Sequence, residues 1–535
     1  MYECPNCGGN LRFDIPSQQL ACKYCDTHVS PYAIKKETDA VEQEYYEATV
    51  FTCPQCAGEI LTTDSEAASF CSFCGASTIL SGRIAKEKRP KYIIPFKITK
   101  ENCKEAYAKK MKKAFFAPKE LRDPKYIEGF RGIYMPYWTY QLTQKGRVSF
   151  AGKKSHREGD YIITEHFKLN GDLDAYYLGY SRDASSGFYD NISEPLAPFD
   201  AKQLVNFEPA FLSGFYADTG DVDASVYLND VTELANNSTF DKVCKEPAFS
   251  GYDINSSENS SKLNAKIPTV CKEADNTMYP VWFLSYRNKD RVAYATVNGQ
   301  TGKVVADMPI DTSKYIISSL VLALPIFLFL NLFFTVIPKT LLGLSCLLVL
   351  ISALIYKSEL KAIRMKENNE DDEGVQIKKK ALRQANKPQQ KVYGLETVGK
   401  KKTVKKKEKK SSLISIIVIC IVAFIWGMPF LINFGTGILW PIVMVADCVV
   451  CGLGISEAQK TGGTAPVGFI VSIVMVVISG LVLLFNPVSD LWYYGGAFLI
   501  LLAVLFNIID VIRNYNRLAM RRLPQFEKRG GDLYA

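Results

Sequence analysis

Two copies of one cysteine pattern constrain the fold of this chain more than any other feature. In each copy, two C-x-x-C pairs are separated by fourteen residues, which is enough for a strand, a turn and a return strand. The copies consist of Cys4, Cys7, Cys22 and Cys25, and of Cys53, Cys56, Cys71 and Cys74. Because four thiolates at this spacing suit one tetrahedral zinc ion, the pattern predicts two zinc ribbons, residues 1–34 and 51–82, joined by a linker of residues 35–50.

The same spacing predicts the role of the metal. Zinc coordination contributes about 10–16 kcal/mol to the folding of comparable peptides, which are too small to fold on an apolar core alone. Every position of each site is a thiolate of the chain, so both ions are expected to be structural. His28 would be a fifth ligand, and we expect it to be a bystander. Small residues follow three of the C-x-x-C pairs, where a tight turn favours a positive φ, namely Gly8 and Gly9, Ala57 and Gly58, and Gly75.

The cysteines also indicate a compartment and a kind of partner. Disulfides would suit a secreted chain, but Met1-Tyr2-Glu3-Cys4 has neither the basic nor the apolar region of a signal peptide. Zinc-bound thiolates in the cytosol are therefore expected. Nucleic acid binding by the ribbons is disfavoured, because Phe51–Gly82 contains acidic residues and no Lys or Arg. Docking of a protein partner is the use that we expect.

The second half of the chain contains apolar segments long enough, or nearly long enough, to cross a hydrocarbon core of about 30 Å. Buried helices of a soluble protein would need polar faces, which these segments lack. The sequence predicts a transmembrane hairpin in residues 316–356 and further transmembrane helices in residues 413–512. The six expected helices are Ile316–Ile337, Leu341–Tyr356, Leu413–Asn433, Ile438–Ile455, Val467–Phe485 and Leu491–Ile512.

Loop charges predict the orientation of these helices, because Lys and Arg are retained in the cytosol. The loop of residues 357–412 contains four runs of lysine and accounts for most of the net charge of +9. The tail of residues 513–535 is also basic, whereas each of the short turns carries at most one basic residue. Both termini, the ribbons and the basic loop are therefore expected in the cytosol. The loop has few apolar residues and is expected to be disordered.

Transport chemistry would require polar groups inside the membrane, and the sequence offers few candidates. Asp447 is the only acidic residue well inside an expected span, and Asp510 lies near a cytosolic end. Cys448 and Cys451 form a further C-x-x-C pair. We interpret this pair as small residues between packed helices in preference to a metal or redox site.

Residues 90–312 have the composition of a soluble domain. Thr99 can cap a helix that carries on one face Cys103, Tyr107, Met111 and Phe115. Aromatic-rich segments and the turn Asn298-Gly299 predict an α+β domain with a mostly antiparallel sheet. Its expected strands are Tyr92–Phe96, Ile133–Tyr140, Tyr161–Leu169, Tyr176–Ser181, Tyr279–Tyr286, Arg291–Val297 and Lys303–Asp307. Asn236–Ser261 is rich in Asn and Ser and is expected to be an exposed loop.

The chain is thus expected to be multidomain, with two small Cys4 zinc ribbons, an α+β soluble domain and an all-α six-helix transmembrane region. Gly299–Lys303 superficially resembles a phosphate loop, but it has the wrong spacing and lies between expected strands. His156 and His166 have no Cys or Ser partner in the sequence. No catalytic residue is predicted, and we expect a protein that is not an enzyme.

Several short motifs occur together with the ribbons. They are Tyr92–Phe96, Tyr134–Tyr140, Phe211–Asp218, Pro280–Trp282 and Val297–Val304. In this combination the chain, from Met1 to about Leu360, resembles a family of bacterial membrane proteins with tandem transcription-factor-B-type (TFIIB-type) zinc ribbons. Members have often been labelled as relatives of the primosomal replication-restart helicase, although this sequence has no ATP-binding loop. The tail from Arg522 is similar to tails of bacterial membrane proteins with a TPM domain, which this chain lacks.

The resemblance implies a membrane anchor for envelope-stress proteins of the phage-shock or flotillin-like (SPFH) kind. We therefore expect a scaffold whose ribbons and β-rich domain bind a cytosolic protein at the inner face of a bacterial cytoplasmic membrane. Its expected partners are the lipid bilayer and that protein, with two structural Zn²⁺ ions and no nucleic acid. The alternatives are a transporter or membrane enzyme built on the six helices, and a nucleic-acid-binding protein.

Overall fold

The computed structural model of the protein describes residues 2–34, 45–62, 71–76, 81–254, 269–333, 337–376, 436–460 and 467–524. The chain forms two compact units. The sheet unit comprises Met1–Pro309, Asn369–Ala381 and Ala519–Ala535. The helical unit comprises Ile310–Asn368 and Leu382–Leu518.

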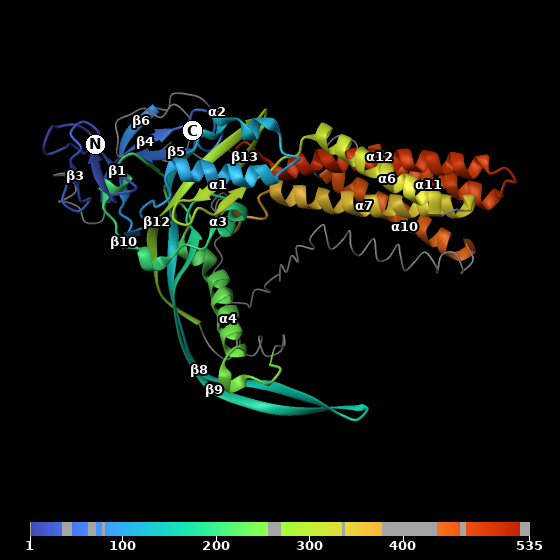
Figure 1. The fold of residues 1–535 in the computed structure, drawn as a ribbon, viewed down its shortest axis with the longest axis horizontal. Coiled ribbons are helices and arrows are strands. Elements are labelled where there is room, and N and C mark those ends of the chain that lie inside the picture. Colours follow the sequence, from blue (N-terminus) through green and yellow to red (C-terminus); the bar gives the residue numbers. More distant parts are fainter. Residues whose placement is uncertain are drawn as a thin grey trace, which may run out of the picture. The chain divides into compact units, whose positions relative to one another are not determined.

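The first cysteine pattern lies on a small antiparallel sheet of its own within the sheet unit (Figure 1). β1 (Leu11–Asp14), β2 (Gln19–Cys22) and β3 (His28–Val29) are hydrogen-bonded in that order. β1 and β2 are the strand and return strand that the fourteen-residue spacing predicts.

The second cysteine pattern belongs to the main sheet. β4 (Tyr45–Thr52) pairs with β5 (Glu59–Thr62) and β6 (Ser81–Lys88), and β5 pairs with β11 (Tyr216–Ala217). In the described residues this sheet has twelve strands, and its central path runs β10-β7-β12-β8-β11-β5-β4-β6. The expectation of a separate second ribbon is therefore wrong for its described part, which forms one edge of the main sheet.

Most of the other strands overlap predicted ones but differ in their bounds. These other strands are β7 (Tyr92–Ile93), β8 (Arg131–Glu158), β9 (Tyr161–Asp183), β10 (Val205–Asn206), β12 (Thr269–Asn288), β13 (Arg291–Asn298), β14 (Val304–Ala306) and β15 (Arg521–Arg522). The expected strands Tyr161–Leu169 and Tyr176–Ser181 form one continuous strand, and the short strands at Val205–Asn206 and Arg521–Arg522 were not predicted. The pairings β11–β8 and β12–β7 are parallel, and the other pairings of the main sheet are antiparallel.

Alternate residues of β8 enter two apolar cores, because successive side chains of a strand point to opposite faces. Tyr134 belongs to one core, and Ile133 and Met135 belong to the other. α1 (Lys100–Lys113) contributes to the first core and α3 (Asp190–Leu196) to the second. The short helix α2 (Pro124–Ile127) also packs against the first core.

The N-terminal cap of α1 forms as predicted. Thr99 Oγ1 accepts a hydrogen bond from the amide of Asn102 at 3.3 Å, and the three apolar residues that follow at helical spacing are buried, namely Cys103, Tyr107 and Met111. Phe115 was expected on the same face, but α1 ends at Lys113 and Phe115 is 63% exposed.

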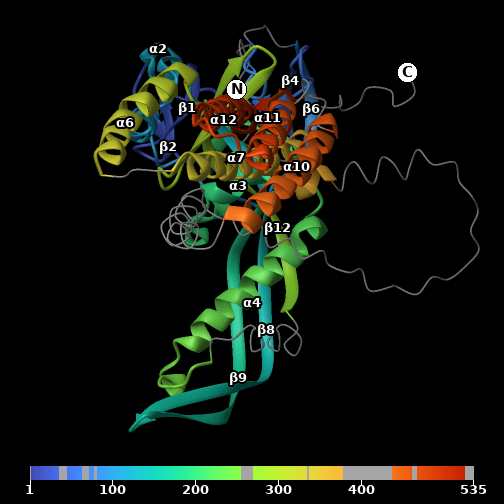
Figure 2. The same cartoon turned by 90° about the vertical axis from the view of Figure 1, so that its right-hand side faces the viewer.

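β8 and β9 continue beyond the rest of the sheet as a long two-stranded arm, and α4 (Leu228–Cys244) lies beside it (Figures 1 and 2). The expected exposed loop at Asn236–Ser261 is therefore wrong as far as Cys244. Gln144 Nε2 donates to Asn236 Oδ1 at 2.6 Å, so a polar residue that indicates a loop by composition is here buried against the arm. Residues 255–268 lie outside the described residues.

The helical unit contains α6 (Thr312–Phe333), α7 (Pro338–Glu367), α10 (Thr436–Lys460), α11 (Val467–Phe485) and α12 (Leu491–Ala519). Four described helices are long and apolar enough to cross a membrane, at Pro338–Glu367, Ile442–Gln459, Val467–Phe485 and Leu491–Ala519. The expected span Ile316–Ile337 overlaps α6, which is not one of these four, and Leu413–Asn433 lies outside the described residues. The helices indicate a membrane protein, and the count of six stays a prediction.

Two boundaries differ from the sequence prediction. The basic loop was expected to begin at Lys357, but α7 continues to Glu367. The basic tail was expected after Ile512, but α12 continues to Ala519 and is followed by β15, which pairs with β13. Residues that follow both helices thus belong to the sheet unit.

Candidate metal centres

All four C-x-x-C pairs make the same turn. The amide of Cys4 donates to the carbonyl of Gly9 at 2.7 Å, and the amide of Gly8 donates back to the carbonyl of Cys4 at 2.8 Å. The other three pairs repeat both hydrogen bonds. The residue four positions after the first cysteine has a positive φ each time: 69° at Gly8, 55° at Asp26, 57° at Ala57 and 70° at Gly75. A positive φ is thus confirmed at Gly8, Ala57 and Gly75, whereas Gly9 and Gly58 do not have one. Asp26 was missed because it is not a small residue.

The turns bring the sulfur atoms of each pattern together. Sγ of Cys4 lies 3.5 Å from Sγ of Cys25, and Sγ of Cys7 lies 3.4 Å from Sγ of Cys22. In the second pattern the corresponding distances are 3.7 and 3.6 Å, for Cys53–Cys74 and Cys56–Cys71. A tetrahedral ion with Zn–S bonds of about 2.3 Å requires sulfur atoms about 3.8 Å apart. Each set of four sulfur atoms, which lie within 4.8 Å of one another, therefore fits zinc.

The first centre lies partly at the surface. Cys4 and Cys22 are buried, Cys25 is half-buried and Cys7 is exposed. Tyr24, between the last two cysteines of the pattern, is 81% exposed. His28 Nδ1 lies 3.0 Å from the carbonyl oxygen of Asp26 and is not part of the sulfur cluster.

The second centre is enclosed by the sheet unit. Its four cysteines are all buried and share an apolar cluster with Phe51, Ile60 and Phe73. Tyr294, on β13, donates its hydroxyl to the carbonyl of Phe73 at 2.6 Å. Leu523, which follows β15, packs against the same cluster. The second centre is thus built into the protein core, although its sequence pattern is the same as that of the first.

One segment, Phe211–Asp218, contacts both ribbons. The rings of Phe13 and Phe211 lie 5.4 Å apart, and Ser213 Oγ donates to the carbonyl of Leu11 at 2.6 Å. Further along the segment, Tyr216 pairs with Thr62 of β5. This segment was singled out in the sequence as a family motif, and its structural role is to hold the first ribbon against the sheet.

His156, His166 and the phosphate-loop-like segment Gly299–Lys303, which were not expected to be catalytic, do not form a site with one another. His156 and His166 lie in the exposed outer part of the arm, where their strand positions place them on opposite faces. The amide of Gly302 donates to the carbonyl of Asn298 at 2.9 Å, and the amide of Asn298 donates to the carbonyl of Lys303 at 2.9 Å. Gly299–Lys303 is therefore the hairpin turn between β13 and β14, as predicted.

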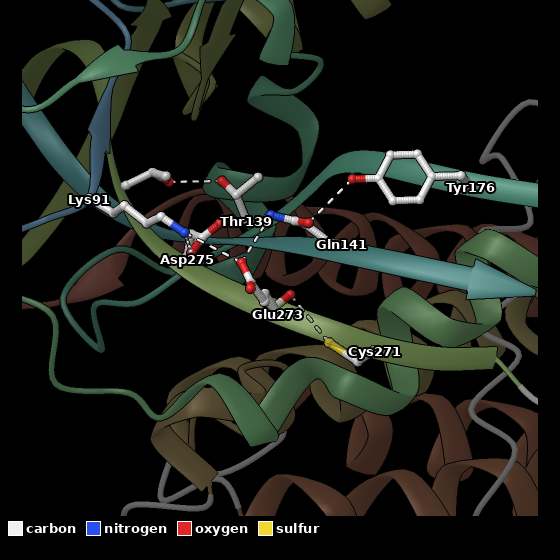
Figure 3. Close-up of polar contacts among 8 residues, drawn as sticks. Lys91, Thr139, Gln141, Tyr176, Cys271, Glu273 and Asp275 are labelled. Carbon is white, nitrogen blue, oxygen red and sulfur yellow. Dashed lines mark hydrogen bonds and ion pairs between the residues drawn. The ribbon is translucent and has the colours of Figure 1, made fainter.

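A polar cluster joins Lys91, which precedes β7, to side chains of β8 and β12 (Figure 3). Lys91 Nζ lies 2.8 Å from Asp275 Oδ1 and 3.4 Å from Glu273 Oε2, and Gln141 Nε2 donates to Asp275 Oδ2 at 3.0 Å. The hydrogen bond to Asp275 raises the pKa of Lys91. Lys91 and Glu273 are each about half exposed, at 49% and 57%, so this cluster fixes strand register and does not form an enclosed site.

A buried polar junction, which sequence reasoning missed, fixes the segments that follow α7 and α12 to the sheet unit. The carboxylate of Asp190 accepts from the amide of Glu373 at 2.8 Å, and that of Asp372 accepts from the amide of Asp190 at 3.3 Å. Arg521, whose side chain is 3% exposed, pairs with Asp371 at 2.7 Å. Burial, reinforced by the charge of Asp190, raises the pKa of Asp372 to about 7. Charged residues in an expected loop and tail gave no signal that they would be buried.

In the helical unit, Asp447 is completely buried on α10, whereas the side chain of Asp510 on α12 is 25% exposed and lies 3.7 Å from Arg513. Cys451 is buried and Cys448 is half-buried. The two do not form a metal-binding group with other described His, Cys, Asp or Glu residues.

Comparison with known proteins gives one informative relative. YdjG of Bacillus subtilis (strain 168), an uncharacterized protein, is 30% identical over 321 residues, which cover 58% of this chain and 91% of YdjG. No family model matches the chain, and no solved structure is similar to it.

Proposed function

This chain belongs to the same family as YdjG of Bacillus subtilis, and from that premise we propose that it is a non-enzymatic scaffold which holds a cytosolic protein at the inner face of a bacterial membrane. The apolar helices anchor the chain, and one Zn²⁺ ion stabilises each cysteine cluster. Envelope-stress proteins of the phage-shock or flotillin-like kind are the partner class that the sequence resemblance implies.

The proposed orientation depends on two independent arguments. Cysteine clusters of this kind stay reduced and bind zinc in a reducing compartment, which favours a cytosolic location for the sheet unit. The lysine runs of residues 357–412 favour the same side of the membrane. An impermeant thiol reagent added to intact cells should therefore leave Cys7 unlabelled, and labelling of Cys7 before lysis would overturn this orientation.

The difference in exposure between the two centres carries the proposal for the docking surface. All four cysteines of the second centre are buried, so that centre offers no free face. The first centre exposes Cys7 and carries Tyr24, which is 81% exposed. An exposed tyrosine on a metal-stabilised turn is a rigid anchor of the kind that is enriched at protein interfaces. We therefore assign docking to the first ribbon around Tyr24, and a structural role to the second.

Substitution of Tyr24 tests this assignment. Full-length protein purified from bacterial membranes should retain a specific cytosolic protein, and Tyr24→Ala should reduce its yield at least about tenfold, the loss expected for an interface anchor. Phe115→Ala is the matched control, because Phe115 is another exposed aromatic residue, at 63%, and belongs to the segment that follows α1 and not to residues 1–34. Equal yields from wild type and Tyr24→Ala would remove the first ribbon as the docking surface.

A further inference from the structure

Within the described residues of the helical unit, two apolar clusters are separated by a layer of buried polar residues, called here the polar level. The Ile500 cluster contains Leu342, Cys346, Val349, Val476, Tyr493, Ala497 and Ile500. The Phe469 cluster contains Ala353, Tyr356, Leu360, Cys451, Ala458 and Phe469. On α7 the two clusters meet between Val349 and Ala353.

Each of the four candidate spans contributes one buried polar residue at the level where the clusters meet. Asp447 lies on α10 between Met444 of the Ile500 cluster and Cys451 of the Phe469 cluster. The corresponding residues of the other helices are Ser352 on α7, Ser472 on α11 and Asn507 on α12. Asp447, Ser472 and Asn507 have no exposed surface, and Ser352 is 8% exposed.

Hydrogen bonds connect three of these four residues, and three buried oxygen atoms of the level remain without a donor from the described part of the chain. Asn507 Nδ2 donates to Ser352 Oγ at 3.2 Å and to Ser472 Oγ at 2.9 Å. Asn507 Oδ1 and both carboxylate oxygens of Asp447 are buried and have no hydrogen-bond partner among the described residues. No Lys, Arg or His side chain of the described chain forms an ion pair with Asp447.

We propose that this polar level, defined by Ser352, Asp447, Ser472 and Asn507, binds one monovalent cation, Na⁺ or H⁺, through the carboxylate of Asp447. Oxygen atoms that accept no hydrogen bond are available as ligands, and hard cations are coordinated by oxygen atoms. A single carboxylate is neutralised by a single positive charge, whereas a divalent ion would leave an excess charge in a medium that strongly disfavours it. The inference goes beyond the scaffold function and does not depend on it.

Gly468 marks the side of the level that leads towards water. A Cβ atom at this position would clash with Asn507 Oδ1 and lie 3.3 Å from Asp510 Oδ2, so only glycine leaves these oxygen atoms free of steric contact. The side chain of Asp510 is 25% exposed. Asn507 and Asp510 are three residues apart on one helix, so they share a face along which a cation can reach the level.

Binding of radiolabelled Na⁺ to the full chain in detergent, at alkaline pH and in a choline background, tests the site. If Na⁺ is the bound cation, wild type binds one ion per chain and Asp447→Asn binds none. Ser472→Ala should weaken binding about tenfold, because Asn507 loses the partner that positions it. Ser479→Ala is the matched control, since Ser479 is also fully buried on α11 but donates to the carbonyl of Met475 in its own helix.

Infrared spectroscopy on the same samples distinguishes bound H⁺ from bound Na⁺. If H⁺ is the cation, Na⁺ does not bind, and wild type shows the carbonyl band of a protonated carboxylic acid that is missing from Asp447→Asn. If Na⁺ is the cation, it removes that band from wild type. Identical Na⁺ binding and identical carboxylic-acid bands in wild type and Asp447→Asn would overturn the proposal, as would an equal loss in Ser472→Ala and Ser479→Ala.

Discussion

The two cysteine clusters have the same spacing, the same turns and similar sulfur distances, yet the fold uses them differently. The first lies on its own three-stranded sheet and leaves Cys7 exposed. The second shares its strands with the main sheet and is covered by Tyr294 and Leu523. A metal-binding motif thus predicts a local turn and a set of ligands, whereas the contacts of the surrounding chain determine whether the motif lies at the surface or in the core.

The largest expected contrast comes from removing one ligand of each centre. Cys56→Ser takes a ligand from a buried site whose zinc contributes on the order of 10 kcal/mol, close to the whole stability of a domain. We expect the sheet unit to lose its resistance to proteolysis. Cys7→Ser should release only residues 1–34 to protease. Zinc content measured on the same samples should fall in both variants, and an intact sheet unit in Cys56→Ser would contradict the structural role of the second centre.

A substitution where the first ribbon contacts the sheet should destabilise the first cluster and not the second, without changing a metal ligand. Phe211→Ala removes a ring that lies 5.4 Å from Phe13 and 5.6 Å from Tyr32. Truncation of a buried phenylalanine costs about 3–5 kcal/mol. Hydrogen exchange should increase in residues 1–34 and stay slow at the second centre. Equal acceleration in both regions would show that the ribbons do not respond independently.

The junction beside the second centre should depend on pH, and the first ribbon should not share this dependence. The carboxyl of Asp372 has a pKa raised from 3.8 to about 7 by burial and by the charge of Asp190, with Arg521 acting in the opposite direction. The folded state therefore holds this proton over a pH range in which the unfolded chain has lost it, so stability falls as the pH rises from about 4 to about 7 and levels off above that.

Hydrogen exchange of the Glu373 and Val375 amides, corrected for intrinsic rates, should show protection that decreases as the pH rises towards neutrality. Asp183 and Asp190, whose pKa values are also raised by burial, act in the same direction. Asp372→Asn should flatten the profile. A profile that is unchanged by this substitution would assign the pH response to the other two carboxyl groups.

The smallest effect concerns the turns themselves. Each cluster has one turn with glycine at the positive φ, at Gly8 or Gly75, and one without, at Asp26 or Ala57. Ala57→Gly should stabilise the second centre by about 1 kcal/mol, because alanine is strained in this conformation. Asp26→Gly should stabilise the first centre less, since aspartate tolerates the left-handed region better. Thermal unfolding of the two variants measures the difference in stabilisation. A loss of stability in Ala57→Gly would contradict the proposed backbone strain at Ala57.

The sequence predicts the parts of the fold that depend on local patterns. Cysteine spacing predicts both ligand sets, and the cap at Thr99 and the turn at Asn298-Gly299 form where their residues indicate. Local patterns do not predict which strands pair when they are far apart in the sequence. Nothing local to Thr62 indicates that it pairs with Tyr216, so the second ribbon could not be recognised as an edge of the main sheet.

Predictions of exposed loops and tails from composition were wrong where polar residues are buried against specific partners. Asn236 lies in a segment that composition assigns to a loop, but it is bound by Gln144 of the arm. Arg521 lies in a basic tail, but Asp371 and the ring of Tyr189 enclose it. Asp447 was noticed in the sequence, whereas Ser352, Ser472 and Asn507 acquire significance only when the packing of the helices places them at one level.

Cysteine accessibility during metal removal tests the difference between the two clusters most directly. The full chain is treated with a limiting amount of zinc chelator and a thiol-alkylating reagent, and modified cysteines are identified by mass spectrometry over time. We expect alkylation first of the exposed cluster, Cys4, Cys7, Cys22 and Cys25. The buried cluster, Cys53, Cys56, Cys71 and Cys74, should stay protected until the sheet unit unfolds. Alkylation of both sets at the same rate, or of the second set first, would contradict this expectation.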